Sequence, residues 1–435
     1  MKEAVTAIAH PQYEGHHQGT RRLLGIPDFR RLLVSRLAAQ WGDGLFQAGL
    51  AGAVLFNPER QADPAAIAAG FAVLLLPYSV VGPFAGALLD RWDRRRVLVT
   101  ANLVRAMFVL FTAVAVGAGL DDVALYASAL MVTGVSRFVG SGLSASLPHV
   151  VPSGNLVEAN ALAATLGALT AVVGAGCAMG LRGLLGAGDG GSAWTTSFAL
   201  IGSVAAAVLA ARFRRGVLGP DQVDEPSRTV TAVALGLVDG ARAAWRAPSV
   251  RAGLVALLAH RAAFGASLLI TLLLMRYAFT DSGPFKAGMA GLGEVAVAGG
   301  AGILVAGLTT DRVVDVLGRR GTVSAALVFA AVAQLGLGLP MLLPTILLAA
   351  FFITLAGQVV KLCVDAAVQS DIGDEVRGRV FALYDTLFNV TQVAAVATAA
   401  AVVPMDGRSP GLIITATVVY LLGLVGYLLM LRRGR

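Results

Sequence analysis

Two charged residues interrupt long apolar stretches in the first half of this 435-residue chain. Asp43 lies between Gly42 and Gly44, and Arg137 lies at the centre of the apolar stretch 123–146. An ionisable side chain at the centre of a bilayer costs at least about 2.5–3.5 kcal/mol, so it commonly marks an ion or substrate pathway. We predict that Asp43 carries a proton and that Arg137 is its partner. The alternative is a static ion pair that locks this half of the molecule.

Two polar stripes occur in the second half of the chain. Polar residues recur every three or four positions within 344–369 and again within 379–403, so each set would share one helix face. Such stripes suit a polar cleft better than a lipid-facing surface. Lys361 and Asp365 could also simply pair along their own helix, and Asp385 could be solvated at the inner helix end. The stripes consist of Gln358, Lys361, Asp365 and Gln369, followed by Asp385, Asn389 and Gln392.

Four further ionisable residues fall within apolar stretches. Glu294 and His260 are the remaining candidates for the pathway. His260 could titrate near neutral pH, but Arg261 beside it would oppose protonation, and a packed, hydrogen-bonded histidine is the alternative. Arg36 and Arg105 lie nearer helix ends, where long side chains can reach the headgroups, and we assign them no functional role.

The composition requires a membrane environment for these residues. Hydrophobic residues make up 57% of the chain and charged residues 14%, and the mean hydropathy is +0.75. Soluble domains have about 25% charged residues, so the chain is predicted to be an all-α integral membrane protein. The pI near 10.0 does not indicate a nucleic-acid partner, because the cations are dispersed among short hinges.

Twelve apolar stretches are long enough to cross a bilayer, at about 20 residues each. They predict two six-helix halves, 32–211 and 249–435, with a cytoplasmic tail at 1–31 and a cytoplasmic linker at 212–248. The predicted spans lie near 32–56, 65–89, 97–119, 123–146, 156–182 and 193–211, then near 250–278, 287–309, 322–339, 344–369, 379–403 and 410–431.

The distribution of arginine and lysine predicts the orientation. Cations concentrate in alternate hinges, and positively charged hinges tend to stay in the cytoplasm. Both termini also carry arginine pairs, so both are predicted to be cytoplasmic. The opposite hinges hold only Arg60, Arg182, Lys286 and Arg408.

The linker contains a helical pattern from Thr229 to Arg246. Val233, Leu237 and Ala241 share one face, which suits a helix lying along the inner membrane surface. A flexible connector is the alternative.

A basic hinge follows the second span and recurs, more loosely, after the eighth. Gly86 would let helices approach closely, Asp90 could face the positive end of another helix, and the arginines would hold the turn at anionic headgroups. The hinge is predicted to gate the cytoplasmic side, with a pure role in topology as the alternative. Its copies contain Gly86, Asp90, Arg91, Arg94 and Arg95, and then Gly307, Asp311, Arg312, Arg319 and Arg320.

Together, the two hinges, the twelve spans and the inner linker resemble the major facilitator superfamily of transporters. The resemblance implies two halves that rock about a central site. It also implies that Asp90, and by analogy Asp311, latches the inner gate. Arg137, followed by Gly140 and Gly142, resembles a span-four motif whose arginine is linked to proton coupling.

Within the superfamily, residues 41–43 (Trp-Gly-Asp) and 377–381 (Arg-Gly-Arg-Val-Phe) look most like bacterial drug and siderophore exporters. Three features depart from the family pattern. Asp93 replaces a usual glycine, about one extra helical turn precedes Gly318, and the fifth span lacks a Gly-Pro pair. That span has Gly174, Gly176 and Gly180 instead, which still permit tight helix packing.

The energy source follows by exclusion. No Gly-Lys-Ser/Thr phosphate loop occurs, so this chain is not expected to hydrolyse ATP, and no metal or cofactor motif is present. The sequence predicts a secondary transporter, not an enzyme, that exports small amphipathic molecules in exchange for protons. Sodium coupling and facilitated diffusion remain open. A lipid or lysophospholipid translocator and a non-transporting receptor or scaffold are the alternative functions. We expect a monomer in contact with the lipids of the plasma membrane.

Overall fold

The computed structural model describes residues 20–56, 63–70, 72–73, 75–77, 92–152, 155–219 and 229–432. Within these ranges the chain is helical, with a single isolated bridge between Ser282 and Phe285 and no strand. Nine of the described helices are long and apolar enough to cross a membrane. This agrees with an all-α membrane protein, while the predicted number of twelve spans stays a prediction.

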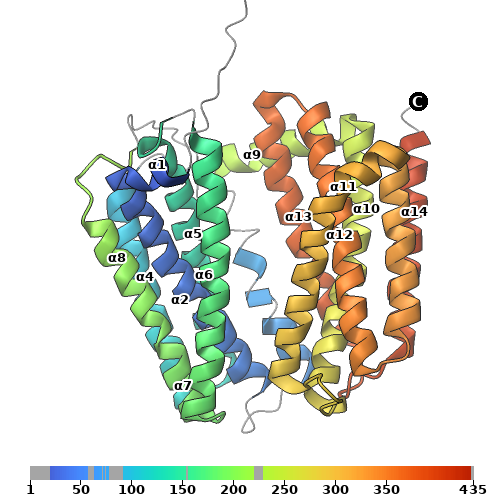
Figure 1. Ribbon diagram of the computed structural model, residues 1–435, viewed down its shortest axis with the longest axis horizontal. Helices are drawn as coiled ribbons and strands as arrows, with labels where there is room; N and C mark the ends of the chain where they lie inside the picture. Colours follow the sequence, from blue (N-terminus) through green and yellow to red (C-terminus); the bar gives the residue numbers. More distant parts are fainter. Residues whose placement is uncertain are drawn as a thin grey trace, which may run out of the picture.

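Two groups of helices stand side by side (Figure 1). The extensive helix contacts of the described residues fall within one group or the other, and we call the groups the first and second bundles. The first bundle contains α1 (Thr20–Gly25), α2 (Pro27–Leu55), α4 (Arg94–Gly117), α5 (Asp122–Ser146), η1 (Leu147–His149), α6 (Leu156–Leu185), α7 (Asp189–Ser197) and α8 (Ala199–Ala211). The second contains α10 (Pro248–Leu273), η3 (Leu274–Ala278), α11 (Gly288–Ala333), η4 (Gln334–Gly338), α12 (Leu343–Asp371), α13 (Asp374–Ala400) and α14 (Pro410–Arg432).

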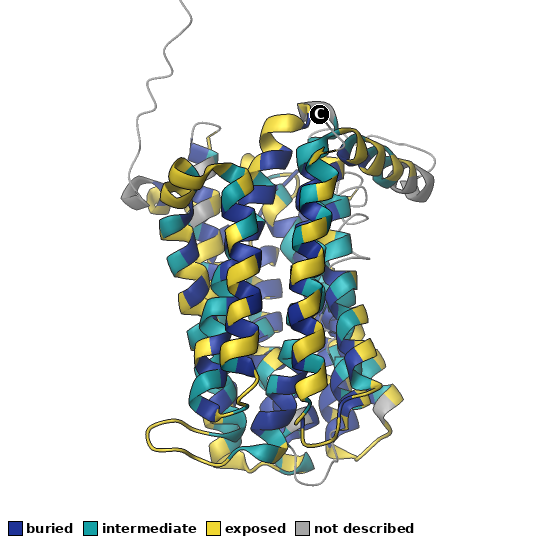
Figure 2. Ribbon diagram, turned by 90° about the vertical axis from the view of Figure 1, so that its right-hand side faces the viewer, coloured by how far each residue is buried: buried dark blue, intermediate teal, exposed yellow. Residues whose placement is uncertain are grey.

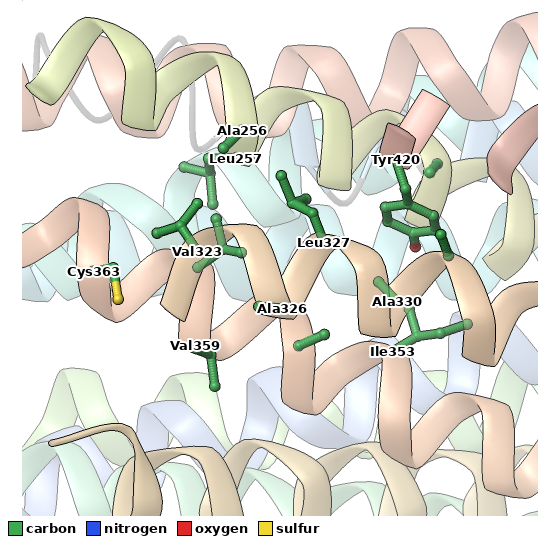
Figure 3. Packing of buried hydrophobic residues seen from close by; sticks show 14 of the residues in the cluster. Ala256, Leu257, Val323, Ala326, Leu327, Ala330, Ile353, Val359, Cys363 and Tyr420 are labelled. Atoms are coloured by element: carbon green, nitrogen blue, oxygen red, sulfur yellow. The ribbon is translucent and has the colours of Figure 1, made fainter. Parts of the chain in front are cut away.

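The helices bury one side and expose apolar residues on the other. Figure 2 shows buried and exposed positions alternating along the long helices. Val297, Leu304 and Leu422 are among the exposed apolar residues, as expected where helices face lipid. Figure 3 shows the core of the second bundle, where Leu257, Leu327 and neighbouring small residues pack together.

Two glycine crossings bring the helices of the first bundle unusually close around Asp43. A Cβ atom at Gly44 would overlap the carbonyl oxygen of Ala171 on α6, and one at Gly202 on α8 would lie 2.8 Å from the Cα of Gly42. Small residues permit this approach between membrane helices. The backbone of α2 on either side of Asp43 therefore packs closely against α6 and α8.

The second hinge lies at a kink between two helices. The segment α11 contains both of them, one for the predicted span 287–309 and one for most of the predicted span 322–339. It is interrupted only at Gly318, whose φ of 67° and ψ of 162° lie outside the helical region. Glycine adopts positive φ without the steric cost that other residues incur, so it can absorb the kink. Both α11 and α10 pass into a π-helical turn, at η4 and η3 respectively.

The helix predicted in the linker is confirmed, and its first and last residues are those predicted: α9 covers Thr229–Arg246. It runs across the ends of the long helices in Figure 1 and packs on α13 and α10. Asp239 on α9 forms an ion pair of 3.2 Å with Arg379 on α13.

The bundles converge at the end opposite α9. Ile67 packs in one apolar cluster with Leu269 and Leu273 of α10, and Arg276 of η3 lies over the ring of Phe56 at 5.6 Å. The bundles diverge toward the end that carries α1, α9 and the C-terminus (Figure 1).

Candidate functional site

The carboxylate of Asp43 lies at the junction of four helices. Its Oδ1 accepts a 2.9 Å bond from Arg105 Nη1 on α4 and a 2.6 Å bond from the Ser136 hydroxyl on α5. Arg105 Nε also donates to the Ser203 hydroxyl on α8 at 3.0 Å. Both members of the ion pair are removed from solvent, with 1% of the Arg105 side chain exposed and 16% of the Asp43 side chain.

A small polar cavity adjoins this network between α2 and α5. Its volume is about 80 Å³, enough for a few water molecules. Residues of α2 at three- and four-residue spacing face it, which places them on one side of the helix. The polar lining consists of Arg36, Gln40, Asp43 and Gln47 from α2 and of Thr133, Ser136 and Arg137 from α5.

The prediction that Arg137 pairs with Asp43 was wrong. Among the described residues, the ion pair of Asp43 is with Arg105 instead of Arg137. Arg137 lines the same cavity as Asp43. The prediction that Arg105 lies near a helix end, with its charge at the headgroups, was also wrong. Arg105 is fully buried.

Lys361 and Asp365 form the charge pair of the second bundle. Lys361 Nζ lies 2.7 Å from Asp365 Oδ2, which matches the alternative to a pathway role, a pairing along α12. This pair is more exposed to solvent than the pair of Asp43 and Arg105, with 34% of the Lys361 side chain and 19% of the Asp365 side chain exposed. Asp365 Oδ1 is buried and has no hydrogen-bond partner in the described part of the chain.

The second polar stripe is only partly available to a ligand. Asp385 is exposed on α13 and interacts electrostatically with Lys361 and Asp365. Asn389 and Gln392 are buried, and the Asn389 amide donates to the backbone oxygen of Asp385 at 2.9 Å. Gln358, from the first stripe, is half-buried on α12, and Gln369 is exposed.

His260 is a packed core residue. Its Nε2 lies 3.1 Å from the carbonyl oxygen of Ile353, and its ring contacts those of Phe264 and Tyr420. The neighbouring Arg261 lies over the ring of Phe388 at 3.6 Å. The geometry matches the structural alternative for His260.

Glu294 holds a loop at the end of the second bundle. Its carboxylate accepts the backbone N–H of Lys286, at 3.1 and 3.3 Å, just before α11 begins. In the same loop, hydrogen bonds from the Ala287 backbone and from Lys286 lower the pKa of Asp281. Both carboxylates therefore organise the loop between η3 and α11.

The arginines of the first hinge bond within the first bundle. Arg94, which is 7% exposed, donates to the carbonyl of Ala145 at 2.9 Å, and its Nη1 lies 2.8 Å from His149 Nε2. Arg95 donates to the carbonyl of Ala211 at 2.7 Å. Asp93 accepts the backbone N–H of Arg95 and so caps α4, which explains an acidic residue here. The predicted gate residues Gly86, Asp90 and Arg91 lie outside the described residues.

The second hinge is more exposed. Gly307, Asp311, Arg312 and Arg320 are exposed on α11. Arg319 lies 3.9 Å from Asp371 and 3.4 Å from the Ser370 hydroxyl, both at the end of α12. Ser249 at the start of α10 also donates to Asp371. This cluster joins three helices of the second bundle.

Sequence reasoning missed Arg105, Ser136 and the glutamines of α2. The recurrence of Arg36, Gln40 and Asp43 at three- and four-residue spacing was available, and it is the same signal that identified the stripe on α12. Arg105 offered no such signal, because its partner is 62 residues away. Within the described ranges, no group of three or more His, Cys, Asp or Glu side chains could hold a metal ion.

Comparison with known proteins identifies the family of this chain. Residues 32–396 match the Major Facilitator Superfamily. An uncharacterized MFS-type transporter of Mycobacterium tuberculosis (strain ATCC 25618 / H37Rv) is 44% identical over 95% of this chain and 94% of its own length. A protein with the same description from Mycobacterium bovis (strain ATCC BAA-935 / AF2122/97) matches equally well.

Solved structures share the fold. The nucleoside transporter NupG superposes with a TM-score of 0.69 at 13% identity, over 92% of this chain and 98% of that one. A mutant of the peptide transporter POT in complex with alafosfalin gives 0.69 at 14% identity, over 93% of both chains. At such identities the likeness concerns the fold alone. The fold is that of a multi-pass membrane transporter and not of an enzyme, and the chain belongs to the Major Facilitator Superfamily.

Proposed function

We propose that this protein is a proton-coupled secondary transporter that exports small amphipathic molecules, with Asp43 as the proton carrier. The observation that supports it most is the enclosed Asp43 carboxylate, which is bonded to Arg105 and Ser136 beside a polar cavity. A buried carboxylate on a membrane helix is a common device for proton transfer.

The geometry suggests how protonation would act on the bundle. A proton arriving through the polar cavity would neutralise Asp43 and remove its attraction for Arg105. Arg105 would keep its charge and its bond to Ser203 on α8. Protonation would therefore loosen α2 from α4 and α5 while α4 stays attached to α8. Deprotonation on the other side of the membrane would restore the pair.

The movement that we propose is a rocking of the two bundles, each a six-helix half with both termini in the cytoplasm. Dense contacts within each bundle and convergence near Ile67 and Arg276 support two bodies that pivot. In this arrangement α9 would lie along the inner membrane surface, with Leu235 and Trp245 exposed toward lipid.

Proton flux in proteoliposomes tests the proposal. The purified chain is reconstituted with the pH dye pyranine inside, and a panel of small amphipathic compounds is added one at a time. We expect at least one compound to drive proton movement through the native protein. Asp43→Asn should reduce that movement to the level of protein-free liposomes while compound counterflow persists.

The control is Asp281→Asn, which changes a carboxylate in an exposed loop. If Asp43→Asn does not fold, Ser136→Ala removes one hydrogen bond to the same oxygen and should shift the pH dependence of transport. Unchanged proton flux in Asp43→Asn, or an unchanged pH profile in a folded Ser136→Ala, would contradict the role of Asp43.

A further inference from the structure

A larger cavity lies in the second bundle, apart from the Asp43 cavity. It measures about 430 Å³, within the range of small-molecule sites. It is bounded by α10, α11 and α12, and η4 and α14 complete its wall. Apolar side chains such as Phe264, Leu292 and Ile353 form most of the lining.

The lining carries no ionisable residue in the part of the chain that the structure describes. Its polar hydroxyls already bond to protein atoms. The Ser267 hydroxyl donates a hydrogen bond to Gln334 Oε1 at 2.8 Å. The Thr271 hydroxyl donates to the carbonyl of Ser267, and the Thr354 hydroxyl donates to carbonyls that include that of Gly299. A charged ligand would lose its hydration here without gaining a counter-ion, which is costly. A neutral, largely apolar molecule would lose little.

The cavity has an entrance on one face of α11. Most lining residues are buried or half-buried, whereas Ala296, Gly300 and Ile303 are exposed. These three recur at four- and three-residue spacing, so they form one stripe on the helix. A Cβ atom at Gly300 would meet no other atom within 4 Å, which shows that space is open beside it.

We propose that this cavity binds a neutral, largely apolar small molecule that enters past Gly300. The inference goes beyond the proposed function, because binding at this place requires no proton step and no contact with Asp43. If the transporter proposal also holds, the cavity would accept the apolar part of the carried compound.

Photolabelling tests the site without knowledge of the natural ligand. The full chain in proteoliposomes is labelled with adamantyl diazirine, a neutral apolar probe, and modified residues are mapped by mass spectrometry. We expect label on lining residues of α10, α11 and α12. 1-Adamantanemethanol at about nine times its Kd should reduce it by about tenfold. Adamantane-1-carboxylate, at matched membrane concentration and neutral pH, should reduce it less than about twofold, because the charge is excluded.

A matched pair of variants tests whether the competable labelling occurs in this cavity. Gly300→Leu places a side chain in the entrance and should abolish the competable labelling. Gly307→Leu is the control, because Gly307 lies seven residues further along α11, is also exposed with open space around it, and does not line the cavity. Both variants gain helix propensity, so a difference between them reports the cavity.

Two outcomes would overturn the proposal. Labelling that excess 1-adamantanemethanol does not reduce would mean that bilayer lipid fills the cavity as it fills any lipid-facing groove. Equal competable labelling in Gly300→Leu and Gly307→Leu would mean that the ligand binds elsewhere. Neither outcome depends on proton coupling, so failure here is distinguishable from failure of the Asp43 mechanism.

Discussion

The two bundles hold their charge pairs in different ways. In the first bundle, Asp43 and Arg105 come from different helices, and hydroxyls from two more helices complete the network. In the second bundle, Lys361 and Asp365 lie one turn apart on α12 and are partly open to solvent. The first pair depends on how four helices pack, whereas the second needs only one helix.

This difference has an energetic consequence. Removing one member of a buried ion pair leaves an uncompensated charge, which costs about 3–5 kcal/mol. Exposed pairs one helical turn apart contribute only about 0.3–0.5 kcal/mol, because water solvates both charges. The pair of Asp43 and Arg105 should therefore affect both the stability of the protein and its response to pH. The pair of Lys361 and Asp365 should contribute mainly to the local charge around α12.

The largest effect is expected for Arg105→Met. It removes the guanidinium but keeps an apolar side chain of similar length, so the Asp43 carboxylate remains buried without its counter-charge. We expect the free energy of unfolding to fall by about 3–5 kcal/mol, measured by denaturant titration in detergent micelles.

The double variant Asp43→Asn with Arg105→Met serves as the control for this prediction. It removes both charges and should be more stable than Arg105→Met alone, because no unpaired carboxylate remains. If the double variant is no more stable than the single one, the loss comes from packing around Arg105 and the buried-charge explanation is wrong.

A smaller loss is expected for Gly44→Ala, which tests the close approach of α2 and α6. The added methyl group would collide with the Ala171 carbonyl and push α6 away from α2. Overpacking of this kind costs about 1–3 kcal/mol. The same denaturant titration measures it, and hydrogen exchange should show faster exchange in α2 and α6.

Gly176→Ala on α6 is the matched control for the crossing, since a Cβ atom there meets nothing within 4 Å. It should be neutral or stabilising by up to about 1 kcal/mol, because alanine is the better helix former. Equal destabilisation by the two variants would mean that α6 does not require its close approach at Gly44.

The smallest effect is expected for Lys361→Met in the second bundle. Lys361 is 34% exposed, so water can partly replace it, although Asp365 Oδ1 is buried. The free energy of unfolding should therefore fall by about 1 kcal/mol, less than for Arg105→Met. Unfolding measured at low and high salt should show that the difference shrinks with ionic strength. A loss as large as that of Arg105→Met would erase the contrast between the bundles.

The outcome for individual residues shows how far sequence reasoning reached. The helix Thr229–Arg246 was predicted correctly, and the pairing of Lys361 with Asp365 was foreseen as an alternative, because both depend on residues within a few turns of one another. Asp43 was placed correctly inside a polar network, but its partner was not. Nothing local distinguishes Arg105 from Arg137 as that partner, since each lies on a different helix from Asp43.

The sequence by itself determined the all-helical membrane class, the family and the position of most apolar helices. The class and the helix positions follow from composition, hydrophobic length and helical periodicity, and the family follows from the resemblance that the two hinges, the twelve predicted spans and the linker carry. Only the tertiary structure decided the partner of Asp43, the close crossings at Gly42 and Gly44, and the cavity beside Gly300. Each of these depends on which distant helices meet and at what distance, and that is set by packing over the whole bundle.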